Sequence, residues 1–373
     1  MNIFTKKLNF KNPSALKNKI LLESHNLNNL ASGLGTFNFE LIKAISNQKI
    51  DDLDIILNIG NISKFKKIFS EKFSYKQYFT FQRYPMLYTR QKFNLWHSLN
   101  QNIKLEPHYK SKYILTVHDV NFFEEISNDY NHKRNKLFIE KIERADKVVY
   151  ISEFAKTQTH QYFDLSGKEE SIIYNGNPVF NLLDTSNTSS PFLKENEPFF
   201  FSIGDFIERK NFEVIVKMMS HFKDFKLIIA GNNTKKYGDA IRKLISERKL
   251  ENKVFLAGKI SNEEKQFYLK NCRAFLFPSI REGFGLPPIE AMRFQKPVFL
   301  SKYTSLPEIG GDAAFYWDNF DEIEMKEMVI SQLNYFDNNK SQMEQKLLER
   351  ALYFSWDKAA EEYLKLYRQT LNL

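Results

Sequence analysis

Cysteine is nearly absent from this chain. Cys272 is the single one among 373 residues, which excludes an intramolecular disulfide and fits a reducing compartment. No apolar run approaches the ~18–20 residues that a membrane-spanning helix needs. Residues 1–7 contain no apolar core of the kind that a secretory signal carries. We therefore expect a cytoplasmic protein without a transmembrane segment.

Metal-ligand patterns are lacking as well. The seven histidines are scattered along the chain without the spacing that metal sites show. Asp52 and Asp54 form a D-x-D pair, but they lie at the start of an expected strand and not in a glycine loop. The sequence therefore predicts no metal site. Cationic side chains and helix dipoles can stabilise a departing anionic group without a metal.

The chain does have enough apolar residues for two domains, and it has an excess of positive charge. Hydrophobic residues make up 42% of the sequence, which allows a core in each of two domains of ordinary size. The net charge of +9 favours anionic partners: nucleotides, phospholipid surfaces or nucleic acid. No nucleic-acid-binding motif is visible, so we expect no nucleic-acid partner. A non-catalytic basic protein that binds nucleotides or nucleic acid is the alternative, which a salt series would test.

Apolar runs alternate with helical patterns through both halves, which predicts an α/β fold built on parallel sheets. The expected strands of the first half are residues 20–22, 53–57, 113–117, 148–151 and 171–174. Residues 184–191 have the composition of a linker. The expected strands of the second half are residues 199–204, 227–231, 254–258, 274–277 and 298–300. Apolar side chains at helical spacing predict a last helix over residues 356–371.

The most informative stretch is residues 279–290, SIREGFGLPPIE, in which Glu282 and Glu290 stand eight positions apart. It follows an expected buried strand, contains two glycines and enters a helix near Pro288. Such a loop directs backbone N–H groups and the positive end of a helix dipole at a ligand, which suits a diphosphate. Glu282 at the loop mouth and Glu290 in the expected first helical turn can accept hydrogen bonds from vicinal hydroxyls. The loop is therefore expected to hold a sugar nucleotide; a plain strand-to-helix turn with two solvated glutamates is the alternative.

Two further strand ends carry candidate ligand-binding side chains. Arg209 and Lys210 follow the strand that ends at Gly204, where a planar guanidinium and a point-like ammonium can meet a diphosphate. His118 follows the strand of residues 113–117, where a ligand cleft would lie. The alternatives are a solvated Arg-Lys pair and a histidine satisfied by the local backbone.

These motifs resemble those of retaining GT-B glycosyltransferases of glycosyltransferase family 4. The resemblance rests on the E-x7-E spacing and on further segments: residues 204–211 (GDFIERKN), 296–298 (KPV), 305–308 (SLPE) and 311–314 (GDAA). It covers most of the chain, is strongest over residues 199–318 and is weak over residues 64–90. Asp205 stands where family members often carry an arginine, which leaves the charge clamp to Arg209 and Lys210.

The resemblance implies a fold of two Rossmann-like domains that face each other across a cleft. The first, which binds the acceptor, would comprise residues 1–183. The second, which binds the donor, would comprise residues 196–355, with the helix of residues 356–373 crossing back to the first. The implied catalytic residues are Glu282, His118, Arg209 and Lys210. The implied donor-binding residues are Gly33, Gly35, Arg209, Lys210, Ile260, Phe284, Gly285, Leu286 and Glu290.

The implied reaction is a metal-independent, retaining transfer of a hexose from a nucleotide diphosphate sugar. Glu282 would position the hydroxyls of the sugar and Glu290 would hold the ribose. Neither glutamate is assigned as a nucleophile, because retention in this family is commonly explained by same-face attack assisted by the leaving phosphate. No cofactor besides the donor is implied.

The substrates follow from the closest resemblance within the family. The ERKN and SLPE variants look most like bacterial mannosyltransferases of O-antigen and other surface-polysaccharide assembly, so GDP-mannose is the favoured donor and a UDP-hexose the second. The implied acceptor is a glycan or a lipid-linked glycan. A GT-B epimerase or hydrolase of sugar nucleotides is the alternative, which release of an epimer or a free sugar would reveal.

Residues 64–90 interleave cations with rings, from Lys64, Lys66 and Lys67 to Phe79, Phe81 and Arg90. Such a composition suits a membrane interface, where rings sit at headgroup depth and cations meet anionic lipid. The alternative is a helix with an aromatic core face and a solvated basic face. An anionic membrane surface is thus an expected partner, with peripheral attachment to the inner face of the membrane as the accompanying location.

Overall fold

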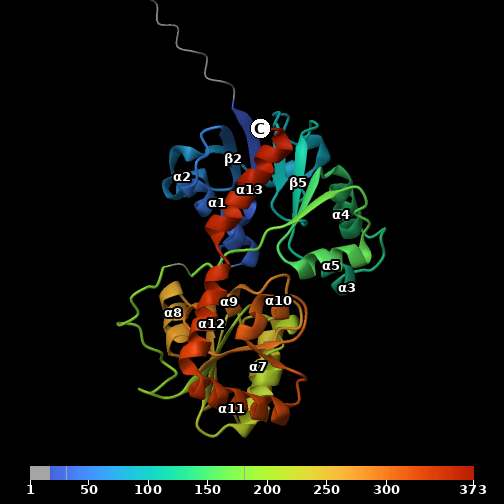
Figure 1. Cartoon of the computed structure of the whole chain (residues 1–373). Coiled ribbons are helices and arrows are strands. Elements are labelled where there is room, and N and C mark those ends of the chain that lie inside the picture. Colours follow the sequence, from blue (N-terminus) through green and yellow to red (C-terminus); the bar gives the residue numbers. More distant parts are fainter. Residues whose placement is uncertain (1–16, 31, 180) are drawn as a thin grey trace, which may run out of the picture.

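The structure is a computed structural model that describes residues 17–30, 32–179 and 181–373 (Figure 1). The expectation for residues 1–7 lies outside this described part. The described strands form one seven-stranded and one six-stranded sheet. All neighbouring strands within each sheet are parallel. The predicted α/β architecture with two Rossmann-like sheets is confirmed.

The N-terminal sheet has the strand order β3-β2-β1-β4-β5-β6-β7. Its strands are β1 (Asn18–Glu23), β2 (Leu53–Ile59), β3 (Ser74–Gln77), β4 (Leu95–Ser98), β5 (Lys112–Val117), β6 (Lys147–Tyr150) and β7 (Glu169–Ile172). The central strands are continuous apolar runs because helices cover both faces of the sheet. The direction of strand addition reverses between β1 and β4, which creates the crevice where doubly wound sheets bind ligands.

The C-terminal sheet repeats this plan in the order β10-β9-β8-β11-β12-β13. Its strands are β8 (Phe199–Ile203), β9 (Lys226–Ala230), β10 (Val254–Gly258), β11 (Ala274–Phe277), β12 (Val298–Ser301) and β13 (Phe315–Trp317). The switch point lies between β8 and β11, the two strands that carry the predicted diphosphate residues at their carboxyl ends. No helix or strand occurs among the described residues from 173 to 198, where the linker was expected.

Helices connect the strands and cover the sheets (Figure 1). Those of the N-terminal half are α1 (Gly33–Asn47), α2 (Ile62–Phe69), α3 (Phe122–Glu125), α4 (Lys133–Arg144) and α5 (Glu153–Tyr162). Those that follow are α6 (Phe212–Met218), α7 (Lys236–Glu247), α8 (Asn262–Asn271), α9 (Leu286–Arg293), α10 (Leu306–Gly310), α11 (Glu322–Asn338), α12 (Lys340–Tyr353) and α13 (Trp356–Leu371). None of the helices in the described ranges combines the length and the apolar character that a bilayer crossing requires.

Helix α13 crosses back to the N-terminal half, as the family resemblance implied, and lies against α1 (Figure 1). Its tyrosines reach the core of the N-terminal sheet. The hydroxyl of Tyr367 lies 2.8 Å from Nδ1 of His97 on β4, and the hydroxyl of Tyr363 lies 3.2 Å from Oγ1 of Thr116 on β5. Arg368 pairs with Asp52 at 2.8 Å on the surface. The end of the chain is thus part of the N-terminal core.

Residues 62–90 contain buried and exposed aromatic side chains in separate places. Phe65 and Phe69 of α2 are buried, while its lysines face solvent, as the amphipathic alternative described. The short 3₁₀ helices at Thr80–Arg83 and Pro85–Leu87 instead expose apolar side chains, including Phe81 at 52% and Met86 at 91%. Most of the exposed apolar side chains therefore lie after β3, and α2 adds Ile68, which is 46% exposed.

His97 generates a testable pH dependence of stability. Burial, aided by repulsion from His118, lowers the pKa of His97 from 6.5 to about 3. Between these values the unfolded chain binds a proton that the folded chain does not, so stability falls as the pH falls below 6.5. The contribution of His97 to this loss is about 1.4 kcal/mol per pH unit. The free energy of unfolding, measured with urea at pH 7, 6 and 5, should therefore decrease less with falling pH for His97→Gln than for the unmodified protein.

Candidate active site between the two sheets

The loop after β11 enters α9 through two glycines that the geometry requires. A Cβ added to Gly283 would lie 2.1 Å from the carbonyl oxygen of His118, so only glycine permits this approach. Gly285 has a φ of +118°, which L side chains rarely adopt, and it directly precedes α9. The helix begins at Leu286, so its first N–H groups face the loop. Glu290 lies in the second turn of α9 and not in the first, because the helix begins two residues before Pro288.

Glu282 is the centre of an ion cluster in this loop. Its Oε1 atom accepts a hydrogen bond from Oγ of Ser279 at 2.6 Å and pairs with the ammonium of Lys210. Nη1 of Arg209 lies 3.5 Å from Oε2 of the same carboxylate. The structure thus brings together three of the four predicted catalytic residues, which come from the carboxyl ends of β8 and β11.

Backbone contacts tie the loops after β8 and β11 together. The carbonyl oxygen of Arg209 accepts hydrogen bonds from the N–H of Ile280 at 2.9 Å and from Oγ of Ser279 at 3.0 Å. The Arg209 guanidinium donates to the carbonyl oxygen of Arg281 at 2.6 Å. The Lys210 ammonium lies 4.8 Å from the centroid of the Phe277 ring. These contacts fix both cations against the glycine loop.

The carboxyl group of Glu282 is ionised at neutral pH. Burial alone raises its pKa, but the charges of Lys210 and Arg209 and the hydrogen bonds to the carboxylate outweigh burial and lower the pKa overall. Burial also lowers the pKa of Lys210, and the charge of Glu282 opposes that shift. Glu282 can therefore accept hydrogen bonds from hydroxyl groups but does not donate a proton.

His118, at the end of β5, has its backbone carbonyl oxygen beside Gly283 and a neutral imidazole. Its Nε2 atom lies 2.9 Å from the carbonyl oxygen of Leu99, so Nε2 carries the proton and Nδ1 is left as an acceptor. Burial lowers the pKa of His118 to about 4, against the opposing effect of this hydrogen bond. The Phe37 ring of α1 packs edge-on against the imidazole, with the ring centroids 4.6 Å apart. The local backbone therefore provides a hydrogen-bond partner for Nε2 of His118 but not for Nδ1.

Three contacts join the two halves around the glycine loop. Oγ of Ser152 donates to the carbonyl oxygen of Gly283 at 2.7 Å. The carboxylate of Glu308 accepts from the first two N–H groups of α5, those of Glu153 at 2.7 Å and of Phe154 at 3.0 Å. Arg281 pairs with Glu124 at 2.5 Å. The carboxyl ends of the two sheets therefore face each other across this loop.

Glu290 lies in a second, smaller charged group. Its Oε1 atom pairs with Nζ of Lys265 on α8 at 2.8 Å, and only 5% of the residue is exposed. Glu40 of α1 lies close enough for the charges of Lys265 and Glu290 to act on it, although burial is the main reason that its pKa is raised. The predicted ribose-binding carboxylate thus faces α1 as well as α8.

The other predicted donor-binding residues lie at element boundaries. Gly33 is the exposed first residue of α1, with open space where a Cβ would stand, whereas a Cβ on Gly35 would lie 1.9 Å from the carbonyl oxygen of Asn29. Ile260 is half-buried between β10 and α8. Phe284 is buried with its ring 5.4 Å from that of Phe354, so only its backbone can face a ligand.

No group of three or more His, Cys, Asp or Glu side chains within residues 17–30, 32–179 and 181–373 is placed to hold a metal ion. Asp52 of the D-x-D pair binds Arg368 instead. Independence from metal stays a prediction, because an ion can bind together with a substrate.

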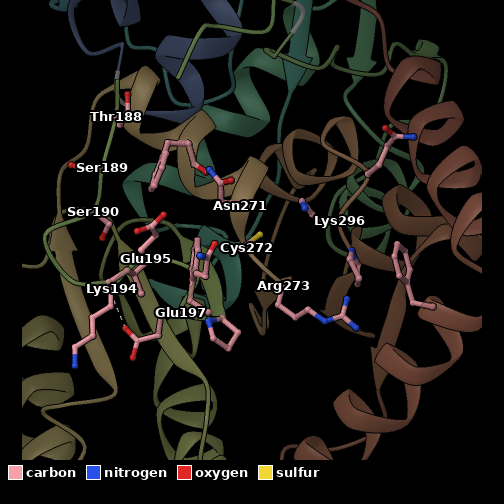
Figure 2. A pocket seen from close by; sticks show the side chains of 18 of the residues that line it. Thr188, Ser189, Ser190, Lys194, Glu195, Glu197, Asn271, Cys272, Arg273 and Lys296 are labelled. Atoms are coloured by element: carbon pink, nitrogen blue, oxygen red, sulfur yellow. Dashed lines mark hydrogen bonds between the residues drawn. The ribbon is translucent and has the colours of Figure 1, made fainter. Parts of the chain in front are cut away.

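A cavity of about 660 Å³ lies elsewhere, at the amino ends of the C-terminal strands (Figure 2). It is lined by the linker and by residues such as Phe199, Arg273 and Pro297, which begin or precede β8, β11 and β12. None of the predicted site residues lines it. Ligands of parallel sheets bind at the opposite, carboxyl edge, so we do not assign the active site to this cavity.

Several contacts of the site were not predicted from the sequence. Ser279 was noted as part of a motif, but its hydrogen bond to Glu282 was not foreseen; the Ser-x-x-Glu spacing was the signal for it. Lys265 carried no signal, because a lysine in an amphipathic helix is usually solvated. The role of Glu308 as a cap on α5 depends on how the two halves meet, which no local pattern encodes.

Comparisons with known proteins find glycosyltransferases with similar sequences and the same fold. Residues 185–334 match the family model described as glycosyl transferases group 1. O-antigen chain mannosyltransferase RfbU of Salmonella typhimurium is 28% identical over 56% of this chain and 57% of its own length. O-antigen chain mannosyltransferase B of Escherichia coli is 21% identical over 94% of this chain and 99% of its own length. The structure of sucrose-phosphate synthase from Thermosynechococcus elongatus superposes with a TM-score of 0.75 at 19% identity, over 95% of this chain and 99% of that one, which shows the shared fold.

The Glu282 cluster predicts unequal costs for removing its two cations. Lys210→Ala leaves a buried carboxylate without its nearest cation and should lower the free energy of unfolding by roughly 3–5 kcal/mol. Arg209→Ala should lower it far less, because the Arg209 side chain is one-third exposed and Lys210 remains. Urea unfolding of both variants measures the difference.

The matched control for this prediction is the double variant Lys210→Met with Glu282→Gln, which removes both charges. It should be more stable than Lys210→Ala, because no unpaired charge remains buried. Equal destabilisation by Arg209→Ala and Lys210→Ala would show that the carboxylate does not depend on the buried ammonium.

Proposed function

We propose that this chain moves a hexose from a nucleotide diphosphate sugar to a hydroxyl group of a glycan, and the match of residues 185–334 to the glycosyl transferases group 1 model supports this proposal. The observation that carries the proposal is the cluster of Glu282, Lys210 and Arg209. It places two cations and an ionised carboxylate beside the glycine loop, in which Gly283 approaches the backbone carbonyl oxygen of His118. The cations suit the diphosphate of a sugar nucleotide, and the adjacent carboxylate suits the hydroxyls of its sugar.

In the proposed reaction an oxygen of the acceptor hydroxyl bonds to the anomeric carbon of the donor sugar. The bond from that carbon to the diphosphate oxygen breaks, and its electron pair stays with the diphosphate. The proton of the acceptor hydroxyl passes to an oxygen of the leaving phosphate, so no protein nucleophile is required. Attack and departure on the same face of the sugar retain the anomeric configuration.

Stabilisation of the departing diphosphate is the main contribution of the protein. Arg209 and Lys210 supply positive charge, and the N–H groups at the start of α9 and of α1 supply fixed dipoles. Glu282 accepts hydrogen bonds from the hydroxyls of the transferred sugar. Nδ1 of neutral His118 accepts another, since its Nε2 proton is engaged by Leu99. Glu290 accepts from the ribose, and the backbone around Ile260 borders the base.

GDP-mannose is the proposed donor and a UDP-hexose the second candidate. Both O-antigen relatives described above are mannosyltransferases by name, which supports mannose as the sugar and a glycan or lipid-linked glycan as the acceptor. The family match does not favour a sugar-nucleotide epimerase or hydrolase, or a non-catalytic basic protein.

A lipid-linked acceptor would bring the enzyme to an anionic membrane surface, and residues 79–87 suit such a contact. They expose Phe79, Phe81, Tyr84, Met86 and Leu87 together with Arg83. The rings of Phe79 and Phe81 stack 5.2 Å apart. Lysines on the exposed face of α2 add positive charge in the preceding stretch of the chain. An anionic interface favours exposed rings together with cations.

The proposed roles of the two glutamates separate in a binding experiment. The unmodified protein should bind GDP-mannose more tightly than UDP-hexoses by isothermal titration. Glu290→Gln should weaken binding of GDP itself by roughly tenfold or more, because a charged acceptor of the ribose hydroxyls is lost. Glu282→Gln should leave GDP binding nearly unchanged but reduce transfer of the sugar, because its partner is the hexose.

Titrations are made at a temperature where both variants are folded, since Glu282 is also part of the buried ion cluster. Equally poor GDP binding by the two variants contradicts the separation of roles. An unmodified protein that binds neither GDP-sugars nor UDP-sugars contradicts the proposed function as a whole. The anomeric configuration of the product, read by NMR, tests retention.

Membrane contact predicts that Phe81→Ser with Met86→Ser reduces sedimentation with phosphatidylglycerol-containing vesicles. Lys64→Ser with Lys67→Ser should reduce that binding too, but mainly at low salt, because each cation near an anionic surface contributes about 1 kcal/mol. The matched control is Ile323→Ser with Leu352→Ser, which removes exposed apolar side chains from the C-terminal half. No binding of the unmodified protein to anionic vesicles at low salt would refute the contact.

A further inference from the structure

The loop between β4 and β5 carries a glutamine whose side chain bonds to the backbone at the end of β5. Oε1 of Gln101 accepts a hydrogen bond from the N–H of His118 at 3.1 Å, and its Nε2 donates to the carbonyl oxygen of Asp119 at 2.7 Å. Only 2% of Gln101 is exposed. Both ends of one buried amide are therefore engaged by two consecutive backbone groups.

These two bonds continue the pairing of β4 with β5 beyond the ends of the strands. The paired residues end with Ser98 opposite Leu115, and the chain then turns. The amide of Gln101 takes the place of a peptide group beside the next residues of β5. Its orientation is fixed, because a reversed amide would set two donors against each other at His118 and two acceptors against each other at Asp119.

The same turn holds the ring of His118. The carbonyl oxygen of Leu99 accepts a hydrogen bond from Nε2 of His118 at 2.9 Å. Leu99 and Gln101 thus bind the side chain and the backbone of one residue from a single turn of the chain. With both fixed, the imidazole keeps one tautomer and one direction, and Nδ1 is the ring nitrogen left to accept a hydrogen bond.

A buried ion pair anchors this loop at its other end. The carboxylate of Glu106 pairs with Lys141 of α4 and, at 2.7 Å, with Nη1 of Arg144. It also accepts a hydrogen bond from the hydroxyl of Tyr113 at 3.1 Å. A buried charge that loses its partner is strongly destabilising, so these contacts hold the loop in place. Residues 99–106 are therefore secured at both ends.

The backbone that Gln101 fixes is also the part of the N-terminal half that meets the glycine loop. A Cβ on Gly283 would lie 2.1 Å from the carbonyl oxygen of His118 and 3.3 Å from Cβ of Asp119. A displacement of these residues would change both the direction of the His118 ring and the contact with the loop that carries Glu282. A misplacement of ~1 Å in a reacting site can reduce a rate about 100-fold.

We propose that Gln101 is a positioning residue for the sugar transfer, whose amide fixes the backbone of residues 118 and 119 so that His118 presents Nδ1 to the transferred sugar. The inference rests on the proposed function, in which that nitrogen accepts a hydrogen bond from the sugar. Gln101 contacts no substrate itself, because its amide is buried and fully engaged. It therefore affects the rate of transfer and not the affinity for the nucleotide.

Gln101→Leu and Gln101→Glu test this role with GDP-mannose as donor and α-mannotriose as the acceptor probe. Gln101→Leu should reduce kcat roughly 10- to 100-fold, with the dissociation constant for GDP within twofold. In Gln101→Glu the new carboxyl group, when protonated, can accept from the N–H of His118 and donate to Asp119. When ionised it repels the carbonyl oxygen of Asp119. The kcat of this variant should therefore fall, relative to the unmodified protein, as the pH rises.

The His118 ring gives a readout that does not depend on turnover. In protein with isotope-labelled histidine, NMR of the imidazole nitrogens distinguishes the tautomers, and His118→Gln identifies the signals of His118. The unmodified protein should show one neutral tautomer at pH 6, since burial lowers the pKa of His118 to about 4. Gln101→Leu should show averaged tautomers or partial protonation at the same pH.

Gln266 of α8 provides the matched control. Its Oε1 accepts from the N–H of Leu183 at 2.8 Å and its Nε2 donates to the carbonyl oxygen of Asn181 at 3.1 Å. It is 6% exposed, so it makes the same pair of buried bonds, but to the segment that joins the two halves. Gln266→Leu should lower the melting temperature about as much as Gln101→Leu and leave both kcat and the His118 signals unchanged.

Each of three outcomes would overturn the positioning role: an unchanged kcat in Gln101→Leu, an equal loss of kcat in Gln266→Leu, or unchanged His118 signals in Gln101→Leu. If Gln101→Leu does not fold, the same comparisons are made with Gln101→Glu across the pH range. An unmodified protein that transfers no sugar from GDP-sugars or UDP-sugars refutes the proposed function instead. The NMR measurement still decides whether Gln101 orients His118, so the two failures are distinguishable.

Discussion

Glu282 carries a negative charge in a residue that is only 8% exposed. A charge at that depth costs several kcal/mol unless cations and hydrogen-bond donors surround it. Lys210, Arg209 and Ser279 provide them, which forces the loops after β8 and β11 to lie together at the switch point of the sheet. The constraint also acts in reverse, since burial lowers the pKa of Lys210 and the charge of Glu282 raises it, so the carboxylate favours the charged form of the lysine. Burial of Glu282 and Lys210 therefore requires the same arrangement of the two loops on which the proposed chemistry depends.

The close contact between the two halves follows from the same loop. Since Gly283 lacks a side chain, its backbone can lie against the carbonyl oxygen of His118. The hydroxyl of Ser152 donates a hydrogen bond to the carbonyl oxygen of Gly283. Glu308 adds a carboxylate at the positive end of α5. These contacts are few and polar, whereas α13 joins the N-terminal core through buried tyrosines. A hinge motion would therefore break the contacts around the loop before it disturbed α13.

Much of the fold could be predicted from the sequence because its signals are local. Apolar runs such as residues 274–277 predict buried parallel strands, and the spacing of residues 356–371 predicts the last helix, whose crossing the family resemblance implied. The residues that surround Glu282 were predicted because each follows a strand end, and parallel strands bring such ends to one edge. The start of α9 was misjudged, since Pro288 is compatible with several positions of the first turn.

The remaining contacts depend on side-chain burial, which local patterns do not determine. Lys265 and Glu290 are far apart in the sequence, and nothing in either helix indicates that they pair. Glu23 and Asn58 read as the polar ends of two apolar strands, which is an ordinary feature of strand boundaries. Only their burial without partners distinguishes them.

The two switch points therefore differ in how their polar groups are satisfied. In the C-terminal sheet the protein itself satisfies the buried carboxylate of Glu282, so a donor exchanges one set of interactions for another. In the N-terminal sheet Oε2 of Glu23 and the amide of Asn58 have no such internal partner among the described residues, so their burial lowers stability by roughly 1–3 kcal/mol for each unpartnered group.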